Sequence, residues 1–296
     1  MNINFLVPGF SKCGTTTLCS LLHDHPDIFM PKFKEAGYLA KDDYDQRRDE
    51  YAVLFSGLTT ESVLGEGSTW YTNVEFEETS RQNILKHFPD VKLIFIARDP
   101  IARIESSFRE YHHSGPRFGL DCPFDLNQAL RQYPNIIKDT LYWLRILNYL
   151  PYFPEEQILV LFMEDLASDP DCELSRCFEF LRVDPSIRVP NAARRLNAGS
   201  TKFFDTERLR RMRHDPDTGS SLSKIPPDIQ DQFLVGLGLR KKFSGGPLLW
   251  DDSTLKWVLE KIEDDSRNFL QAYGKPLDIW PRFAEKCTDS ISGPTP

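Results

Sequence analysis

Three short stretches of the chain place basic, acidic and small hydroxyl residues where they could hold an anion and move a proton. The first is FLVPGFSKCGTTTL, residues 5–18, in which an apolar run breaks at Pro8-Gly9 and enters a loop with one lysine, Lys12, and three threonines. Such a strand, loop and helix start forms a nest of backbone N–H groups that attracts an anion, and the helix dipole adds to the attraction. Two glycines at this spacing are about equally typical of a structural turn. The usual ATP-binding loop has its lysine directly after the last glycine, where this chain has Thr15.

The second stretch is ARDPIARIESS, residues 97–107, which follows the strongest strand pattern of the chain. Arg98 offers a planar fork of donors that suits phosphate oxygens. Ser106 follows eight residues later, two turns into the expected helix, and adds a hydroxyl. A structural ion pair with a nearby acid explains Arg98 taken alone equally well.

The third stretch is KFKEAGYL, residues 32–39, which carries Lys34 and Glu35 side by side. A carboxylate close to the anion-binding loop could accept a proton from a reacting group. On composition alone a solvated Lys–Glu pair at the surface explains these residues better.

Together the three stretches resemble sulfotransferases that use 3′-phosphoadenosine 5′-phosphosulfate (PAPS), in the branch of the heparan sulfate enzymes and their bacterial small-molecule relatives. The resemblance covers nearly the whole chain. It implies that Glu35 is the catalytic base, that Lys12 stabilises charge on the oxygen that bridges sulfur and phosphorus, and that no metal is required. It also implies a set of donor contacts around the two phosphate groups of PAPS: Ser11, Lys12, Cys13, Gly14, Thr15, Thr16 and Thr17 at the phosphosulfate, Arg98 and Ser106 at the 3′-phosphate, and Lys202 and Ser200 in a late loop.

A fourth stretch, GEGSTWYTN at residues 65–73, resembles the G-E-K-S-P-x-Y segment of the acceptor cleft in this branch. Gly67 stands where lysine is frequent and Thr69 where proline is frequent. Relatives that act on heparan often carry a histidine two residues after the base, where this chain has Gly37. The resemblance and the aromatic content predict acceptor contacts at Tyr38, Glu66, Ser68, Trp70, Tyr71 and His112, although a lone aromatic such as Trp70 is more often a core residue.

The histidines at 112 and 113 are weaker candidates for the base than Glu35. In cytosolic sulfotransferases the histidine base precedes the arginine-bearing strand, whereas His112 and His113 follow it. The two are also adjacent and cannot both face one side of a helix, which disfavours a metal site.

The elements that must position these residues alternate between strand and helix, which predicts an α/β fold with a central, mostly parallel sheet. The resemblance implies the three-layer fold of P-loop nucleotide kinases. We expect one domain over residues 1–296, with acceptor-side insertions at about 36–60 and 112–135 and a late donor-contact region at about 190–225. Strands are expected near residues 4–7, 27–30, 62–68, 91–97 and 157–163, helices near 15–23, 75–87, 137–150, 172–183 and 253–273, and irregular structure over 190–227.

The composition limits the classes of function. The formal net charge of −8 and a pI near 5.4 argue against a general nucleic-acid binder. No apolar run approaches the roughly 20 residues of a membrane span, and the first residues lack the plan of a signal peptide. Six cysteines without a CxxC pair predict reduced thiols, hence a cytoplasmic protein, as a monomer or homodimer.

The sequence therefore predicts transfer of a sulfuryl group from PAPS to a hydroxyl or amine. The acidic run KDDYD, residues 41–45, favours a small neutral or cationic acceptor such as a natural-product intermediate. A saccharide or glycolipid acceptor is the alternative within this class. A P-loop kinase and a non-catalytic PAPS-binding protein are the alternatives of other classes.

Overall fold

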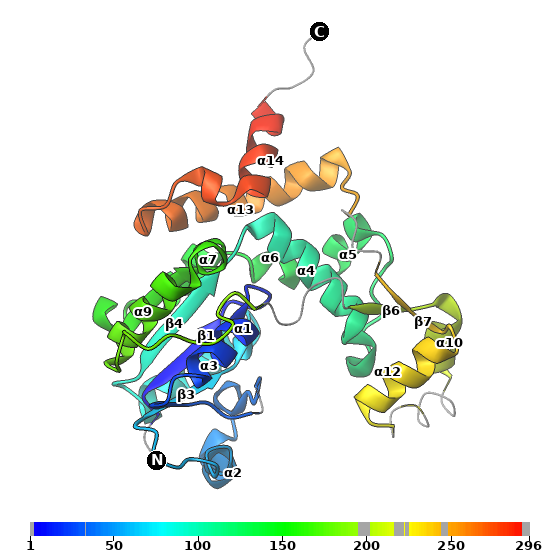
Figure 1. Cartoon of the computed structure of the whole chain (residues 1–296). Helices are drawn as coiled ribbons and strands as arrows, with labels where there is room; N and C mark the ends of the chain where they lie inside the picture. Colours follow the sequence, from blue (N-terminus) through cyan, green and yellow to red (C-terminus); the bar gives the residue numbers. More distant parts are fainter. Residues whose placement is uncertain are drawn as a thin grey trace. The chain divides into compact units, whose positions relative to one another are not determined.

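The computed structural model describes residues 3–32, 34–194, 202–215, 222, 225–243 and 248–291 (Figure 1). The chain separates into two compact units. The first contains residues 1–103, 137–196 and 257–296, and the second contains residues 104–136 and 197–256. One domain can contain two compact units, so the expected single domain stays a prediction.

A five-stranded parallel sheet forms the centre of the first unit. Its strands are β1 (Phe5–Gly9), β2 (Ile28–Phe29), β3 (Val63–Gly67), β4 (Lys92–Ala97) and β5 (Ile158–Phe162), in the spatial order β2-β3-β1-β4-β5. All four pairings are parallel. The predicted α/β class with a mostly parallel sheet is confirmed.

Helices cover both faces of this sheet. The connection through α1 (Thr15–His23) moves away from β4, whereas the connection through α3 (Glu77–His87) moves towards it, so right-handed crossovers put these helices on opposite faces. Side-chain contacts agree with this. The ring of His25, just after α1, lies 4.5 Å from Phe178 on α9 (Pro170–Leu181), and Arg145 on α7 (Tyr142–Tyr149) pairs with Glu77 on α3 at 2.5 Å.

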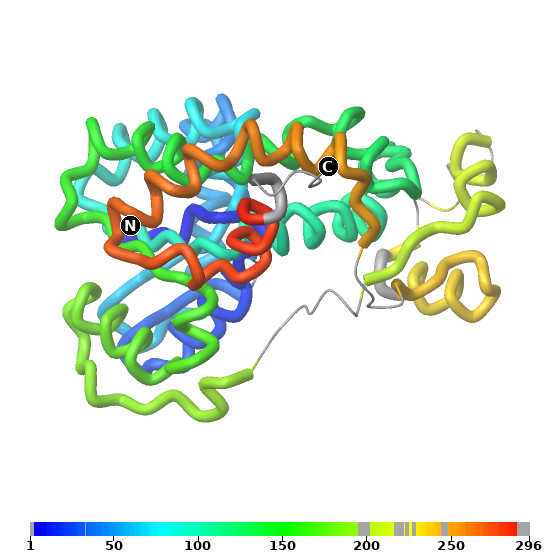
Figure 2. The backbone as a smooth tube through the Cα atoms, turned by 90° about the horizontal axis from the view of Figure 1, so that it is seen from above, coloured from blue at the N-terminus to red at the C-terminus, as the bar shows by residue number. Residues whose placement is uncertain are grey.

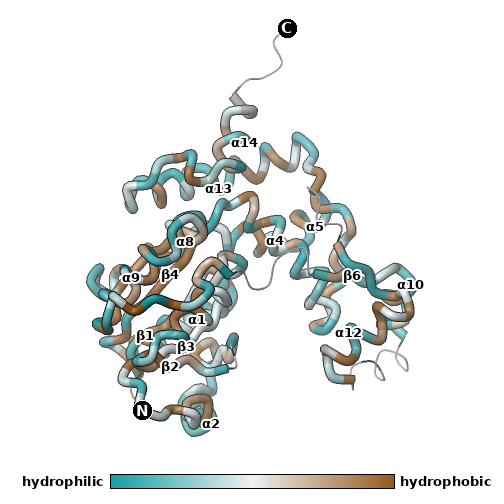
Figure 3. Tube along the Cα trace, viewed as in Figure 1, coloured by the Kyte–Doolittle hydropathy of each residue, from teal (hydrophilic) through white to brown (hydrophobic). Residues whose placement is uncertain are grey.

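The core of the first unit is apolar along the strands and aromatic beneath the C-terminal helices. Residues 93–97 of β4 are fully buried, and hydrophobic residues concentrate on the strands in Figure 3. The part of α13 (Asp252–Ala272) from residue 257 lies against the segment leading into α14 (Pro281–Ile291), orange and red in Figure 2. Here the rings of Phe269 and Trp280 stack with centroids 5.9 Å apart, and Trp280 is fully buried. Such packing fixes the helices on the sheet.

The second unit has a small cluster of buried leucines and a sheet of two strands that lie far apart in the sequence. The strands β6 (Phe203–Asp205) and β7 (Arg240–Lys242) are antiparallel, beside α10 (Glu207–His214) and α12 (Pro227–Gly236). One cluster of buried leucines consists of Leu209, Leu222, Leu234 and Leu239. Beside them Arg240 is fully buried and pairs with Asp205 and Asp231.

The remaining elements are short or straddle the boundary between the units. They are α2 (Arg48–Val53), α4 (Pro100–His113), α5 (Leu126–Gln132), α6 (Asn135–Lys138), α8 (Met163–Ser168) and the 3₁₀ turns η1 (Tyr38–Ala40), η2 (Tyr44–Arg47), η3 (Thr69–Thr72), η4 (Gly115–Phe118), η5 (Glu155–Gln157) and η7 (Leu277–Ile279). Among the described helices none is long and apolar enough to cross a bilayer.

Two expectations about individual elements were wrong. The helix predicted over 137–150 is two helices, α6 and α7, separated by residues 139–141. The region 190–227, expected to be irregular, contains β6 and α10. The other predicted strands and helices lie within a few residues of the observed ones.

Candidate active site

The predicted site residues of the first unit gather at the carboxyl ends of three neighbouring strands. The loop 10–14 follows β1, Arg98 follows β4, and residues 68–72 follow β3, and β1 pairs with both other strands. Glu35 joins them because its backbone N–H donates to the carbonyl of Gly67 at 3.0 Å. The carboxyl edge is where ligands bind in open parallel sheets, so the topology brings the donor loop and the proposed base to one edge.

The loop after β1 leads directly into α1 and leaves the start of this helix open. Gly14 is the N-cap residue in a left-handed conformation (φ 92°), and no side chain caps the helix. Lys12 also has a positive φ of 67°. Cys13 and Thr15 are buried and anchor the loop, whereas Ser11, Lys12, Gly14, Thr16 and Thr17 are half-buried. An uncapped helix start beside partly exposed polar side chains suits a phosphate or sulfate group.

A tyrosine of α7 connects the loop to the end of β4. The hydroxyl of Tyr142 lies 3.3 Å from Cys13 Sγ and donates to the carbonyl of Arg98 at 2.9 Å. The guanidinium of Arg98 in turn donates to the carbonyl of Lys12 at 3.4 Å. Arg98 and the loop after β1, which the sequence predicts to bind the donor, are therefore joined by hydrogen bonds.

Burial sets the chemistry of the loop thiol. It raises the pKa of Cys13 to about 11, although the charge of Arg103 opposes this. The thiol is therefore neutral near pH 7 and acts as packing and a weak hydrogen-bonding group rather than as a nucleophile.

A second arginine, Arg103 on α4, forms a hydrogen bond to the backbone of the loop from the protein interior. Only 1% of Arg103 is exposed. Its Nε donates to the carbonyl of Ser11 at 3.1 Å, and its Nη1 donates to Thr140 Oγ1 at 2.9 Å. The carboxylate of Asp139 lies 3.8 Å from Nη2 and accepts from Asn73 Nδ2 at 3.0 Å. Arg103 thus links the donor loop to the segment that follows η3.

Glu35 has a side chain fixed by its neighbours. Its backbone has a positive φ of 64°. The N–H and hydroxyl of Thr69 donate to its Oε2 at 2.7 Å and 3.0 Å, and the Nζ of Lys34 donates to its Oε1. The side chain is 36% exposed, so an acceptor can reach it. An accessible carboxylate at the same sheet edge as the donor loop has the properties of a general base.

Two of the predicted acceptor contacts, Glu66 and Tyr71, are buried. The Tyr71 hydroxyl donates to Glu66 Oε2 at 2.7 Å. Burial raises the pKa of Glu66 to about 8, the bond from Tyr71 opposes this, and the charge of Glu35 adds to it. Ser68 is also fully buried, and its hydroxyl has no hydrogen-bond partner among the described residues. Contact of these three with an acceptor stays a prediction, and in the structure they form the layer beneath the surface.

The rings of the aromatic residues nearer the surface are in contact with cationic side chains of the protein. Trp70 stacks on Phe76 with centroids 5.1 Å apart, and the Lys41 ammonium lies 4.6 Å from the Trp70 ring. The Arg47 guanidinium lies 4.7 Å from the ring of Tyr38. These faces can therefore hold a positive charge.

The remaining predicted residues belong to the second unit or lie outside the described residues. Ser106 lies half-buried on the part of α4 assigned to that unit. Lys202 is paired with Glu110 at 2.8 Å. Ser200 lies outside the described residues. Contacts of these residues with the donor stay predictions.

His112 is enclosed within the second unit. It is 2% exposed, its Nε2 lies 3.0 Å from the Pro123 carbonyl, and its Nδ1 lies 3.0 Å from Arg210. Burial lowers the pKa of His112 to about 4, and the charge of Arg210 acts in the same direction. The imidazole is therefore neutral near pH 7, and its contact with an acceptor stays a prediction.

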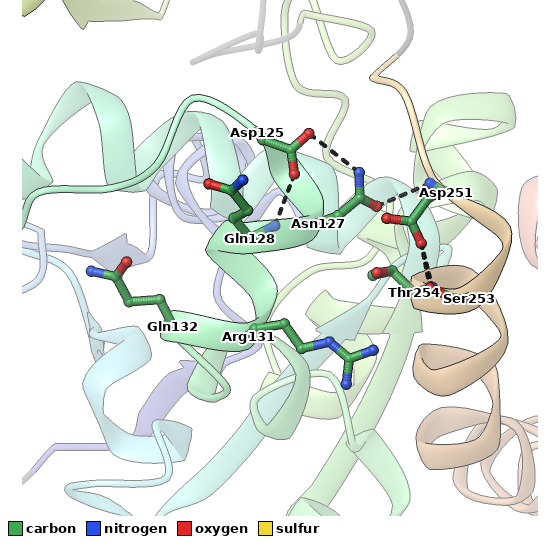
Figure 4. A pocket seen from close by; sticks show the side chains of 8 residues that line it. All are labelled: Asp125, Asn127, Gln128, Arg131, Gln132, Asp251, Ser253 and Thr254. Atoms are coloured by element: carbon green, nitrogen blue, oxygen red, sulfur yellow. Dashed lines mark hydrogen bonds between the residues drawn. The ribbon is translucent and has the colours of Figure 1, made fainter.

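The second unit also has an open polar hollow of about 750 Å³ (Figure 4). Asp125 and Asp251 cap the helices α5 and α13 on its two sides, and Asn127 accepts a hydrogen bond from the N–H of Asp251 at 3.0 Å. None of the predicted site residues lines it.

Sequence reasoning missed Thr69, Arg103, Tyr142 and the buried neighbours that connect them. Arg103 lies five residues after Arg98, at the start of the helix that follows this arginine. A second arginine so close to Arg98 was the available signal. For Tyr142 no local signal exists, because its partners Cys13 and Arg98 are distant in sequence.

Comparison with known proteins identifies the family of the chain. The model of the sulfotransferase domain family matches residues 2–216. Mouse carbohydrate sulfotransferase 15 is 26% identical over 247 residues, which cover 62% of this chain and 44% of the relative. Mouse heparan sulfate glucosamine 3-O-sulfotransferase 6 is 27% identical over 191 residues, covering 60% of this chain and 51% of the relative. The chain thus spans about half the length of these curated relatives or less.

A solved structure supports the fold as well. Mouse sulfotransferase SULT7A1, crystallised in complex with PAP, superposes with a TM-score of 0.50 at 15% identity and covers 97% of this chain and 89% of its own. The predicted resemblance is confirmed. With the loop after β1, Arg98 and Glu35 at one edge of the parallel sheet, the chain belongs to the sulfotransferase domain family.

Proposed function

We propose that the protein transfers a sulfuryl group from PAPS to a hydroxyl or amine of a small acceptor. One observation carries the proposal: the uncapped start of α1, with Lys12 in the loop before it, is tied to Arg98 through a hydrogen bond of 3.4 Å. Two cationic side chains and a helix start at one sheet edge fit the phosphosulfate and the 3′-phosphate of one nucleotide.

In this proposal the chain contributes positioning, charge and a base. The residues 11–17 hold the phosphosulfate, and Lys12 stabilises the charge that develops on the bridging oxygen. Glu35 takes the proton of the acceptor as its oxygen or nitrogen attacks sulfur, and 3′-phosphoadenosine 5′-phosphate (PAP) leaves in line. A P-loop kinase fits less well, because Thr15 stands where the lysine of such enzymes is found.

The acceptor is proposed to be small and neutral or cationic, such as a natural-product intermediate. The run 41–45 follows the base and contains three aspartates, which would repel a polyanion. The rings of Trp70 and Tyr38 hold cations of the chain, which supports the same interpretation. A saccharide acceptor is the second candidate, and the names of the curated relatives favour it.

Calorimetry with PAP and with ATP–Mg²⁺ tests the donor. We expect PAP to bind at least tenfold more tightly, and a preference for ATP would contradict the proposal. Glu35→Gln should keep PAP binding and lose most turnover of radiolabelled PAPS, whereas PAP binding without turnover by the wild-type protein on any acceptor would indicate a non-catalytic PAPS-binding protein.

A panel of acceptors tests the second half of the proposal. We expect sulfation of a small amino-phenol such as tyramine and little sulfation of heparan-like oligosaccharides. The reverse result would favour the saccharide alternative. We further propose a cytoplasmic location, supported by the six free cysteines, and a monomer or homodimer, which light scattering can test.

A further inference from the structure

The carboxylate of Glu35 is held unequally at its two oxygens. Oε2 accepts two hydrogen bonds from Thr69, one from the backbone N–H at 2.7 Å and one from Oγ1 at 3.0 Å. Oε1 accepts one hydrogen bond, from Lys34 Nζ. These are the contacts of the carboxylate within the described residues.

A carboxylate has about four lone-pair positions, two on each oxygen. Thr69 occupies both positions on Oε2, and Lys34 occupies one on Oε1. The remaining position lies on Oε1, and the side chain is partly exposed. The oxygen that can still receive a proton is therefore Oε1.

The strand end below the carboxylate makes this arrangement possible. Gly67 accepts the backbone N–H of Glu35, and a side chain at position 67 would crowd this region, because its Cβ would lie 3.6 Å from Lys34 Cε and 2.6 Å from Cys19 Sγ. Thr69 opens η3 directly after Ser68, so its N–H points out of the turn and is available to the carboxylate.

We infer that Thr69 is a positioning residue for the proton transfer, which fixes Glu35 through Oε2 so that Oε1 takes the proton of the acceptor. The inference rests on the proposed function. As the acceptor oxygen or nitrogen forms its bond to sulfur, its proton moves to Oε1, the bond from sulfur to the bridging oxygen breaks, and PAP keeps the electron pair. The proton then passes from Glu35 to solvent.

Turnover and PAP binding, measured on the same variants, test this inference. Thr69→Val removes the hydroxyl donor and Thr69→Pro also removes the N–H donor, whereas Thr69→Ser keeps both. We expect kcat to fall in the Val variant, to fall further in the Pro variant and to stay close to wild type in the Ser variant. A role of Thr69 confined to the fold would instead lower PAP affinity and melting temperature together with kcat.

The variants suit the local backbone, and a matched control exists. Ser68 is extended (φ −142°, ψ 117°), as a residue before proline prefers, and the first position of a helical turn tolerates proline. If Thr69→Pro fails to fold, the Val and Ser variants decide. The control is Thr79→Val, which removes another hydroxyl–carboxylate bond, from Thr79 to Asp42 at 3.2 Å, and should leave kcat unchanged.

Turnover of radiolabelled PAPS with tyramine gives kcat. A hydrogen bond to a charged group contributes about tenfold, so we expect kcat to fall about tenfold in Thr69→Val and about a hundredfold in Thr69→Pro. The dissociation constant for PAP should stay within twofold of wild type.

The outcomes separate this inference from the proposed function. An unchanged kcat in both Thr69→Val and Thr69→Pro would overturn the inference, even where PAP binds and Glu35→Gln is inactive. Failure of the wild-type protein to bind PAP, or full turnover by Glu35→Gln, would overturn the proposed function instead.

Discussion

The side chain of Arg103 donates from Nε to the backbone carbonyl of Ser11 across 3.1 Å, so a buried cation supports the proposed donor loop from inside the protein. The sequence offered Arg98 for the ligand, and the structure adds Arg103 for the loop. The two arginines lie on successive parts of one strand–helix connection and hold adjacent carbonyls, those of Lys12 and Ser11.

We expect Arg103→Met to weaken PAP binding at least tenfold and to lower the melting temperature by several degrees. Removing one partner of a buried ion pair costs about 3–5 kcal/mol, because the other charge stays buried. Here that charge is Asp139. Calorimetry with PAP and thermal unfolding measure the two effects.

Two further variants control this prediction. Arg103→Lys keeps the positive charge and loses the planar set of N–H donors, so it should retain part of the affinity for PAP. Arg267→Met breaks a partly exposed pair with Glu263 on α13 and should change stability by at most about 1 kcal/mol. Equal losses in the Arg267 and Arg103 variants would contradict the role of Arg103.

The cysteines should differ in reactivity. Burial raises the pKa of Cys13 to about 11 and that of Cys19 to about 12, so at pH 8 about one Cys13 thiol in a thousand is ionised. Cys172 is exposed. We expect iodoacetamide at pH 8 to label Cys172 first, as measured by mass spectrometry of peptides, and rapid labelling of Cys13 in the folded protein would show that the loop is open.

The buried carboxyl of Glu66 predicts a pH dependence of stability. Its pKa is raised from 4.5 to about 8, chiefly by burial, so the folded protein binds more protons than the unfolded chain between these values. This contribution to stability is fully present below about pH 4.5 and is lost as the pH rises through about 8. Relative to wild type, Glu66→Gln should gain several degrees in melting temperature between pH 6 and pH 9. A difference that does not change with pH would show that Glu66 is ionised throughout.

The buried ion pairs of Arg240 predict which part of the second unit unfolds first when they are removed. Arg240 is fully buried between Asp205 and Asp231, beside the small cluster of Leu209, Leu222, Leu234 and Leu239. Arg240→Met should cost about 3–5 kcal/mol and raise hydrogen exchange in β6, β7 and α12 before it affects β4. Arg211→Met removes an exposed pair with Glu207 and should leave exchange unchanged. Uniform loss of protection in both units would contradict a local effect.

Local patterns predicted the central sheet well. Residues 93–97 form a continuous apolar run, and β4 is Lys92–Ala97. The loop after β1 was recognisable because glycines and small hydroxyl residues are the types that a tight turn into a helix start requires. Such requirements involve residues close together in the chain, so they can be predicted from the sequence.

Long-range pairing explains what could not be predicted. The strands β6 and β7 have three residues each, and their pairing joins Phe203 to Lys242, so no local periodicity indicates a strand. The same holds for the site. Glu35 could be selected by its residue type, but the hold of Thr69 on its Oε2 connects positions 34 residues apart.

The contact between Gly67 and Cys19 restricts how this site could evolve. A side chain at position 67 would place Cβ 2.6 Å from Cys19 Sγ, too close for both to remain. A mutation that introduces a long cationic residue at 67 would therefore be deleterious on its own and tolerated only after Cys19 has become smaller. The order of the two substitutions is fixed by sterics, so lineages of this protein can reach a lysine at 67 by one mutational route and not by the other.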